Sequence, residues 1–226
     1  IEIINPINED LSLMRTTLAA SMLNAISRNE KQGTLEGRLF EVASIYIPES
    51  LPLTSYPDER KVLCVGTFGN NESFFTMKGI ANTIAESMDI AFTYEPVQKS
   101  FLHPYQAVKV LCEGTEIGYF GKAAYDIQNE LSMRTSAYIM ELDLKELSRW
   151  YGKKRTFQPI SKFQEEKRDL AFVMDKNISC GDVENCIREA NKYVKEIRLF
   201  DVYEGGQIPE GKKSMAFTVT FAPKEE

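Results

Sequence analysis

Few side chains of this 226-residue chain combine the types and spacings that catalysis requires. His103 is the only histidine, and an imidazole is the commonest general base near neutral pH. Because it precedes Pro104 and stands alone, we interpret it as a turn residue or a hydrogen-bonding histidine. Lys78 and Gly79 could contact a phosphate, but we expect Lys78 to be solvated on the outer face of a helix. No pair of carboxylates occurs in a setting typical of acid–base catalysis.

The four cysteines predict neither a metal site nor a disulfide framework. They are Cys64, Cys112, Cys180 and Cys186, and none forms a CxxC pair. Zinc sites normally use Cys and His at short paired spacings, so we expect no metal, and we expect reduced thiols. No apolar run approaches the roughly 20 residues of a membrane helix. We therefore expect a cytoplasmic protein without a membrane partner.

The charge is divided unevenly along the chain. Residues 1–152 carry 13 Lys and Arg against 20 Asp and Glu, whereas residues 153–226 carry 14 against 13. An acidic first part is not a general polyanion binder, although a local basic patch is not excluded. Residues 66–69 contain too few glycines to hold phosphates as a P-loop does.

These residues must be positioned by an alternating set of strands and helices. In the first part, the pattern predicts a helix that follows Thr17 as N-cap, a second helix at 74–88 and a last helical turn capped by Asp143. It also predicts strands at 39–47, 61–68 and 137–143, and a hairpin at 107–121. In strand 39–47 the apolar residues do not alternate, which predicts a strand covered on both faces.

The second part predicts the order β-α-β-β after a linker at 151–159. Its strands are expected at 168–174, 195–203 and 214–221, and its helix begins with Ser179 and Asp182 in a capping box. The expected buried stripe of that helix includes Cys186. In the last strand, alternation directs Met215, Phe217, Val219 and Phe221 towards the helix and leaves a small, polar opposite face.

Motifs in both parts carry a resemblance to a known family. The segments RDLAF at 168–172 and LFDVYEGGQIPEGKKS at 199–214 resemble the ferredoxin-like anticodon-binding domain of bacterial phenylalanyl-tRNA synthetase beta subunits. The first part is similar to the catalytic-like module of the same subunits at 5–6, 14–16, 39–42, 75–79, 103–104 and 117–121. The resemblance implies an α+β fragment from the C-terminal part of such a subunit.

The implied fragment has two domains. Residues 1–151 would form a degenerate class II aminoacyl-tRNA synthetase core, an antiparallel sheet with helices, and residues 152–226 a partial ferredoxin-like domain lacking its last helix and strand. The holoenzyme would charge tRNA(Phe) with phenylalanine as an α2β2 heterotetramer, using ATP and Mg²⁺. The fragment would hold no cofactor, metal or catalytic residue. Catalytic relatives need an arginine beside the ATP α-phosphate, whereas strand 43–47 ends in Ile47.

The resemblance also indicates two sets of contact residues. Candidates for the interface with the alpha subunit are Asn5, Met14, Arg15 and Phe40. We interpret Arg15 as part of a structural ion pair or interface hydrogen bond, rather than as a remnant of an ATP site. Candidates for tRNA binding are Arg168, Arg198, Tyr203, Lys212 and Lys213, through phosphate contacts and base stacking. A solvated hairpin for the two lysines, and a local Arg168–Asp169 ion pair, remain open alternatives.

Two other functions are kept as hypotheses. In one, the first part is an enzyme module that still binds nucleotide or performs ligation; Ile47 argues against it, and ATP–pyrophosphate exchange would support it. Alternatively, the chain is a free-standing interaction or RNA-binding module that reuses the synthetase-like fold without aminoacylation. If the folded chain bound neither an alpha subunit nor tRNA, that result would favour a role without tRNA.

Overall fold

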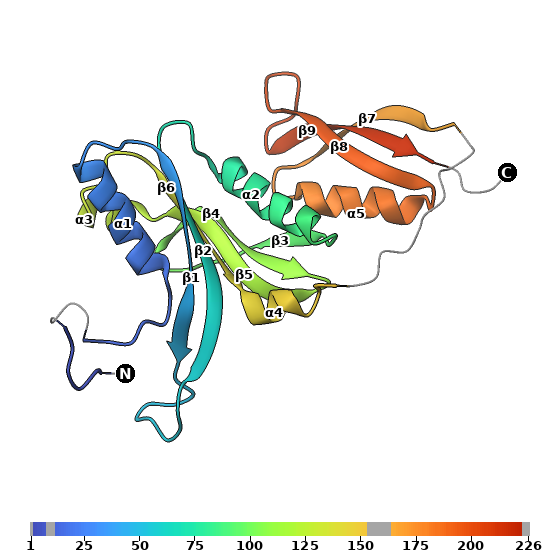
Figure 1. Cartoon of the computed structure of the whole chain (residues 1–226). Helices are drawn as coiled ribbons and strands as arrows, with labels where there is room; N and C mark the ends of the chain where they lie inside the picture. Colours follow the sequence, from blue (N-terminus) through green and yellow to red (C-terminus); the bar gives the residue numbers. More distant parts are fainter. Residues whose placement is uncertain (1, 8–11, 153–163, 223–226) are drawn as a thin grey trace. The chain divides into compact units, whose positions relative to one another are not determined.

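The computed structural model describes residues 2–7, 12–152 and 164–222. The chain divides into two compact units, Ile1–Lys154 (unit 1) and Arg155–Glu226 (unit 2), and each is described by itself (Figure 1). Most of the expected linker at 151–159 lies outside the described residues.

Unit 1 is built on a six-stranded antiparallel sheet with the order β1-β2-β6-β5-β4-β3. Its strands are β1 (Gly37–Ile47), β2 (Asp58–Phe68), β3 (Phe92–Pro96), β4 (Leu102–Cys112), β5 (Thr115–Ala123) and β6 (Ala137–Asp143). Its helices are α1 (Ala19–Lys31), α2 (Phe74–Ser87), α3 (Tyr125–Glu130) and α4 (Leu144–Ser148). Helices α1 and α2 lie on opposite faces of the sheet (Figure 1).

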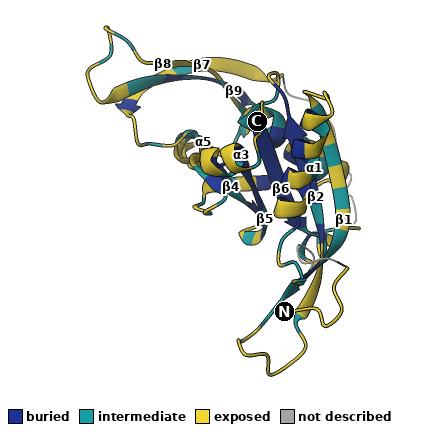
Figure 2. Ribbon diagram, turned by 90° about the vertical axis from the view of Figure 1, so that its left-hand side faces the viewer, coloured by how far each residue is buried: buried dark blue, intermediate teal, exposed yellow. Residues whose placement is uncertain are grey.

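Each face of this sheet has its own hydrophobic core because successive strand residues point to opposite faces. On one face, α1 packs with Cys64, Phe68 and Ile139. On the other, α2 packs with Phe120 and Met140. Strand β6 contributes to both cores and is buried over nearly its whole length (Figure 2).

The helix starts agree with the sequence except at α1. Asp143 accepts from the backbone N–H groups of Lys145 and Glu146, which confirms the predicted cap of α4. At α1, by contrast, the cap position is Leu18 and not Thr17, and Leu18 supplies no side-chain hydrogen bond. The Thr17 hydroxyl nevertheless accepts from the Ala19 N–H at 3.0 Å, and a carboxylate of the sheet accepts from the same group, as described below.

Strand β1 is not covered on both faces, so that prediction is wrong. Its odd-numbered residues pack towards α1, with Ile45 buried. On the other face Phe40 is 76% exposed and Val42 is 50% exposed. The alternation of exposed and partly buried positions is visible along β1 in Figure 2. As an edge strand, β1 extends beyond the cover that α2 provides to the central strands.

Unit 2 has the predicted order β-α-β-β. Strands β7 (Glu166–Asp175), β8 (Val194–Tyr203) and β9 (Lys212–Phe221) form an antiparallel sheet with β9 in the middle. Helix α5 (Cys180–Ala190) starts with the predicted capping box of Ser179 and Asp182. It covers one sheet face, where Met215, Phe217 and Val219 are buried. Cys186, expected on the buried stripe of the helix, is exposed.

Candidate functional site

The β1 patch, which we define as Phe40 and Val42, is an exposed apolar surface within the sheet of unit 1. Both residues have even numbers, so they lie on the strand face opposite α1. Arg38 lies on the same face and forms a 2.9 Å ion pair with Glu72, the residue before the α2 cap. The patch is therefore apolar with a charged pair beside it, an arrangement typical of protein contact surfaces.

Arg15 is fixed to the same strand. Its Nε donates to the carbonyl of Ser44 at 3.0 Å, and a guanidinium nitrogen lies 3.2 Å from Glu41 Oε1. The Arg15 carbonyl also accepts from the backbone N–H of Tyr46 at 2.9 Å. These contacts confirm that Arg15 forms a structural ion pair within the chain.

The other two candidates for the alpha-subunit interface differ in exposure. Asn5 is exposed, and Met14 is partly buried. The segment before Met14 is held to the chain start by the bond from Ile3 N–H to the Ser12 carbonyl at 2.7 Å. The structure thus brings Arg15 and Phe40 to one strand, whereas Asn5 lies in an exposed segment near the start of the chain.

A buried carboxylate, Glu141 of β6, lies at the start of α1. Its Oε1 accepts from the backbone N–H groups of Leu18 at 2.5 Å and Ala19 at 3.1 Å. The hydroxyls of Thr17 and Tyr119 also donate to this carboxylate. Glu141 therefore satisfies two backbone donors at the helix N-terminus and complements the helix dipole, while the Thr17 hydroxyl also accepts from the Ala19 N–H at 3.0 Å.

The surroundings of Glu141 disfavour further negative charge. Burial, together with the charge of Glu141, raises the pKa of the Tyr119 hydroxyl and of the Cys64 thiol above their ordinary values. Both groups consequently stay protonated near neutral pH. Sequence reasoning missed Glu141, because its donors come from segments more than 100 residues away and from a neighbouring strand.

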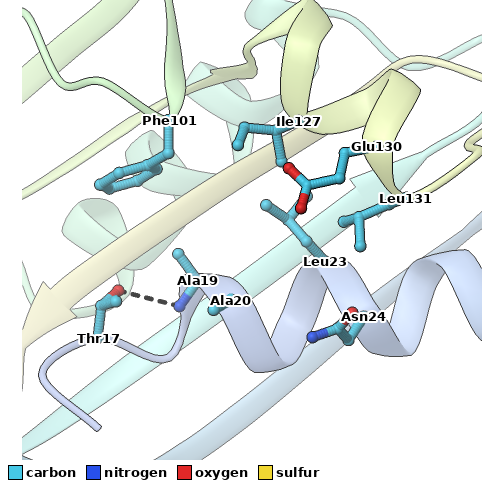
Figure 3. Close-up of a pocket in the computed structure, with 9 residues that line it drawn as sticks. All are labelled: Thr17, Ala19, Ala20, Leu23, Asn24, Phe101, Ile127, Glu130 and Leu131. Atoms are coloured by element: carbon cyan, nitrogen blue, oxygen red, sulfur yellow. Dashed lines mark hydrogen bonds between the residues drawn. The ribbon is translucent and has the colours of Figure 1, made fainter. Parts of the chain in front are cut away.

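An apolar groove of about 240 Å³ lies beside this carboxylate. In Figure 3, Leu23 of α1, Ile127 and Leu131 point towards one another, and Phe101 closes one side. Thr17 and Ala19 line the groove and also contact Glu141. The donors at the start of α1 are thus already occupied by a side chain of the same molecule.

The remaining candidates of unit 1 have structural partners. The backbone N–H of Tyr105 donates to His103 Nδ1 at 3.2 Å, which confirms a hydrogen-bonding histidine. Lys78 is partly buried rather than solvated, and its ammonium lies 5.2 Å from the centre of the Tyr94 ring. Ile47 packs against the core beneath α1.

In unit 2, the face opposite α5 is the open face. Cross-strand partners share a face, so the pairs Arg198–Thr218 and Tyr203–Ser214 place Arg198 and Tyr203 on the open face. Lys212 pairs with Asp175 across the sheet and lies on the same face, at its end. Arg168 and Lys213 pair with residues of the helix-covered side, Val219 and Met174. The structure therefore brings together only three of the five candidates.

Two charged candidates have carboxylate partners. Lys212 lies 3.3 Å from Asp175, and Arg168 forms an ion pair with Glu166. The alternative of an Arg168–Asp169 pair is wrong, because Asp169 points to the open face and accepts from the Thr218 hydroxyl at 2.7 Å. Arg198 has no ion pair among the described residues and is exposed.

Tyr203 is held by the loop that follows it. A Cβ added to Gly205 would lie 2.2 Å from the Tyr203 hydroxyl oxygen, so the ring lies directly against this glycine. Tyr203 remains 46% exposed. A ring with one side packed and the other accessible is suited to base stacking.

No helix among the described residues has the length and apolar character to cross a membrane. In the same residues, no three His, Cys, Asp or Glu side chains gather as a metal site would require.

Comparisons with known proteins agree with this division into two units. Residues 1–144 match the family model "Phenylalanyl tRNA synthetase beta chain CLM domain", and residues 161–226 match "Ferredoxin-fold anticodon binding domain". The phenylalanine–tRNA ligase beta subunit of Clostridium tetani is 34% identical over 98% of this chain, and that of Bacillus subtilis is 30% identical over 98%. The chain spans only 28% and 29% of those relatives. A pyrrolysyl-tRNA synthetase structure from Desulfitobacterium hafniense overlaps 59% of this chain and 48% of its own, with a TM-score of 0.49 and 17% identity.

Proposed function

The chain belongs to the family of the phenylalanyl tRNA synthetase beta chain CLM domain, and from this premise we propose that it serves a phenylalanine–tRNA ligase. The whole enzyme would join phenylalanine to tRNA(Phe) with ATP and Mg²⁺ in the cytoplasm, as an α2β2 assembly. Within it, unit 1 would dock on the alpha subunit and unit 2 would bind tRNA at the anticodon end.

The β1 patch is the observation that supports docking by unit 1. Phe40 and Val42 expose apolar side chains on the face of β1 that the helices leave uncovered. Burying such side chains contributes roughly 25 cal/mol per Å² of apolar area. We assign the alpha subunit to this patch, and we assign Met14 and Arg15 to the adjoining edge of β1. There Arg15 is fixed to the strand by the Ser44 carbonyl and by Glu41, whose side chain lies on the face opposite the patch. Asn5 contributes only as an exposed polar contact.

Unit 1 is proposed to be a class II-like core without catalysis. The antiparallel sheet and its two helical layers are consistent with such a core. The residues do not fit ATP: Ile47 packs into the core, where the resemblance would require a cation for the α-phosphate. In addition, the donors at the start of α1 are occupied by Glu141. We therefore place no step of the reaction in this unit.

Unit 2 is proposed to bind RNA through its open face. The small residues Ala216 and Thr218 leave the sheet accessible, while Arg198 supplies a phosphate contact and Tyr203 a stacking ring. Lys212 would add a phosphate contact at the edge, in competition with Asp175. Arg168 and Lys213 lie towards the helix side, so we assign them no direct part in this contact.

The docking proposal is tested by mixing the chain with the separately expressed alpha subunit and measuring the mass by sizing chromatography with light scattering. We expect a stoichiometric complex with the wild-type chain and its loss with Phe40→Asp. A matched control is Tyr56→Asp, which changes a still more exposed aromatic residue in the loop between β1 and β2. A complex that survives Phe40→Asp would refute the assignment of the β1 patch.

The absence of catalysis is tested separately. The chain alone should give no phenylalanine-dependent ATP–pyrophosphate exchange. Exchange above background would instead support the hypothesis that unit 1 retains a nucleotide site.

A further inference from the structure

A wide irregularity interrupts the pairing of β4 and β5 in unit 1. Leu102 pairs with Ala123, but the next pair is Ala107 with Gly121, so four residues of β4 face the single residue Lys122. Gly121 permits this close approach, since a Cβ there would lie 2.6 Å from the carbonyl oxygen of Gln106. Bulges of this kind redirect side chains and are common beside functional sites. Here the bulge contains His103 and Tyr105, and both His103 and Lys122 contact Tyr125.

Lys122 is a buried cation without an anion. It is 8% exposed, yet it takes part in no ion pair within residues 2–7, 12–152 and 164–222. Its ammonium donates to the Tyr125 hydroxyl at 3.3 Å and lies 4.7 Å from the centre of that ring. Burying an ammonium costs free energy unless it is paired. The aromatic contact offsets only part of that cost, because a cation–π contact contributes about 0.5–2 kcal/mol.

His103 adds a second donor to the same place. Its ring packs edge-on against Tyr125 with centroids 5.3 Å apart and planes at 82°. Since Nδ1 accepts from the Tyr105 backbone, the neutral ring carries its proton on Nε2, which makes no hydrogen bond within the described parts of the chain. The Tyr125 hydroxyl, which accepts from Lys122, keeps its own proton to donate.

Aromatic rings are exposed around these donors. Tyr105 is 90% exposed and Tyr125 is 58% exposed. Such rings provide stacking surfaces for nucleobases. The ammonium, the imidazole N–H and the phenol O–H are three donors of the kind that phosphate oxygens accept from.

We propose that Lys122, His103 and Tyr125 form a binding site for the phosphate group of a nucleotide, whose base stacks on Tyr105. The phosphate supplies the anion that Lys122 lacks, and the neighbouring rings favour a nucleotide over inorganic phosphate. The site belongs to unit 1 and stands independently of the open face of unit 2, so failure of one proposal leaves the other intact. A free nucleotide and a nucleotide within an RNA strand share this chemistry, and the experiment below distinguishes the two sources.

The single histidine makes the test direct, because its ring protons give one set of resolved NMR signals. The 226-residue chain is titrated at fixed pH and ionic strength with inorganic phosphate, then with uridine 5′-monophosphate, and then with a single-stranded tetrauridylate. We expect saturable shifts of the His103 signals with all three, and tighter binding of the nucleotides than of phosphate. Tighter binding of the tetramer than of the monomer identifies an RNA strand as the source, and equal binding identifies a free nucleotide.

Variants separate the site from a general salt effect. Lys122→Gln should weaken binding by at least about tenfold, and Tyr125→Phe by about threefold. The matched control is Lys78→Gln, which removes another lysine that lies over a tyrosine ring, 5.2 Å from Tyr94. Backbone amide spectra verify that each variant is folded, and Tyr125→Phe keeps the test valid if Lys122→Gln does not fold. The proposal is overturned if no ligand gives a saturable shift. It is also overturned if folded Lys122→Gln binds the nucleotides as tightly as the wild type does. If Lys122→Gln does not fold, the same criterion applies to Tyr125→Phe.

Discussion

The six-stranded sheet of unit 1 and the three-stranded sheet of unit 2 differ in how their faces are covered. In unit 1 helices pack on both faces, and buried polar groups such as Glu141 have partners within the molecule. In unit 2, α5 covers one face and the other carries small and polar residues, such as Ala216 and Thr218. When helices cover both faces of a sheet, only its edge strand and its ends remain accessible to a partner. When helices cover one face only, the whole opposite face remains accessible.

The largest expected effect follows from removing the internal acceptor of unit 1. Glu141→Ala removes the acceptor of the Leu18 N–H and of the Thr17 and Tyr119 hydroxyls, whereas the Ala19 N–H keeps Thr17 Oγ1 at 3.0 Å. Each unsatisfied buried donor costs about 1–3 kcal/mol. We expect the free energy of unfolding of unit 1 to fall by about 4–5 kcal/mol. Trp150, the only tryptophan, packs against the core of unit 1 and reports this transition by fluorescence in urea.

The matched control for this variant is Glu59→Ala, which removes an exposed carboxylate from β2. It should change the unfolding midpoint very little. Equal stability of the two variants would mean that the buried carboxylate does not hold α1 in place.

A slightly smaller loss is expected in the thin core of unit 2. Phe217 is fully buried between the sheet and α5, and Phe→Ala substitutions of this kind cost about 3–4 kcal/mol. Phe217→Ala should therefore unfold unit 2 at lower urea, as followed by its backbone amide signals. The Trp150 transition should stay unchanged, and a parallel shift would show that the units do not unfold separately.

The open face should respond more strongly than the helix side in RNA binding. Tyr203→Ala removes a stacking ring and should weaken tRNA(Phe) binding about tenfold, as measured by fluorescence anisotropy. Arg198→Ala should weaken it about fivefold. Arg168→Ala is the control, because Arg168 pairs with Glu166 and lies on the side of α5. If Arg168→Ala had the greatest effect of the three, RNA would bind the other face.

Much of the local structure could be predicted, because it depends on neighbouring residues. The capping box at Ser179, the cap at Asp143 and the β-α-β-β order follow from short sequence patterns, and the structure confirms them. The acceptor of α1 could not be predicted, since Thr17 and Glu141 are 124 residues apart. The same holds for the exposed face of β1, which depends on where α2 ends its cover.

The sites show the same limit. The resemblance supplied the contact residues as sets, but strand register separates Arg198 and Tyr203 from Arg168 and Lys213. The cluster around Lys122 depends on a bulge of four residues, and no sequence pattern marks its position. His103 was recognised as a hydrogen-bonding residue, yet its neighbours became evident only in the fold.

The smallest expected effect concerns the exposed ion pair of unit 1. Arg15 and Glu41 have half-exposed side chains, and ion pairs of this kind contribute about 0–1 kcal/mol. Arg15→Gln should therefore lower the free energy of unfolding by less than about 1 kcal/mol, again measured through Trp150. A loss as great as that of Glu141→Ala would remove the contrast between an exposed pair and a buried acceptor.

The division of labour between the units is tested most directly by one light-scattering series on sizing chromatography. Wild-type chain, Phe40→Asp and Arg198→Ala are each mixed with the alpha subunit and, separately, with tRNA(Phe). We predict that Phe40→Asp loses the alpha subunit and keeps tRNA, whereas Arg198→Ala keeps the alpha subunit and weakens only the tRNA complex. Loss of both partners by either folded variant would contradict the assignment of one partner to each unit.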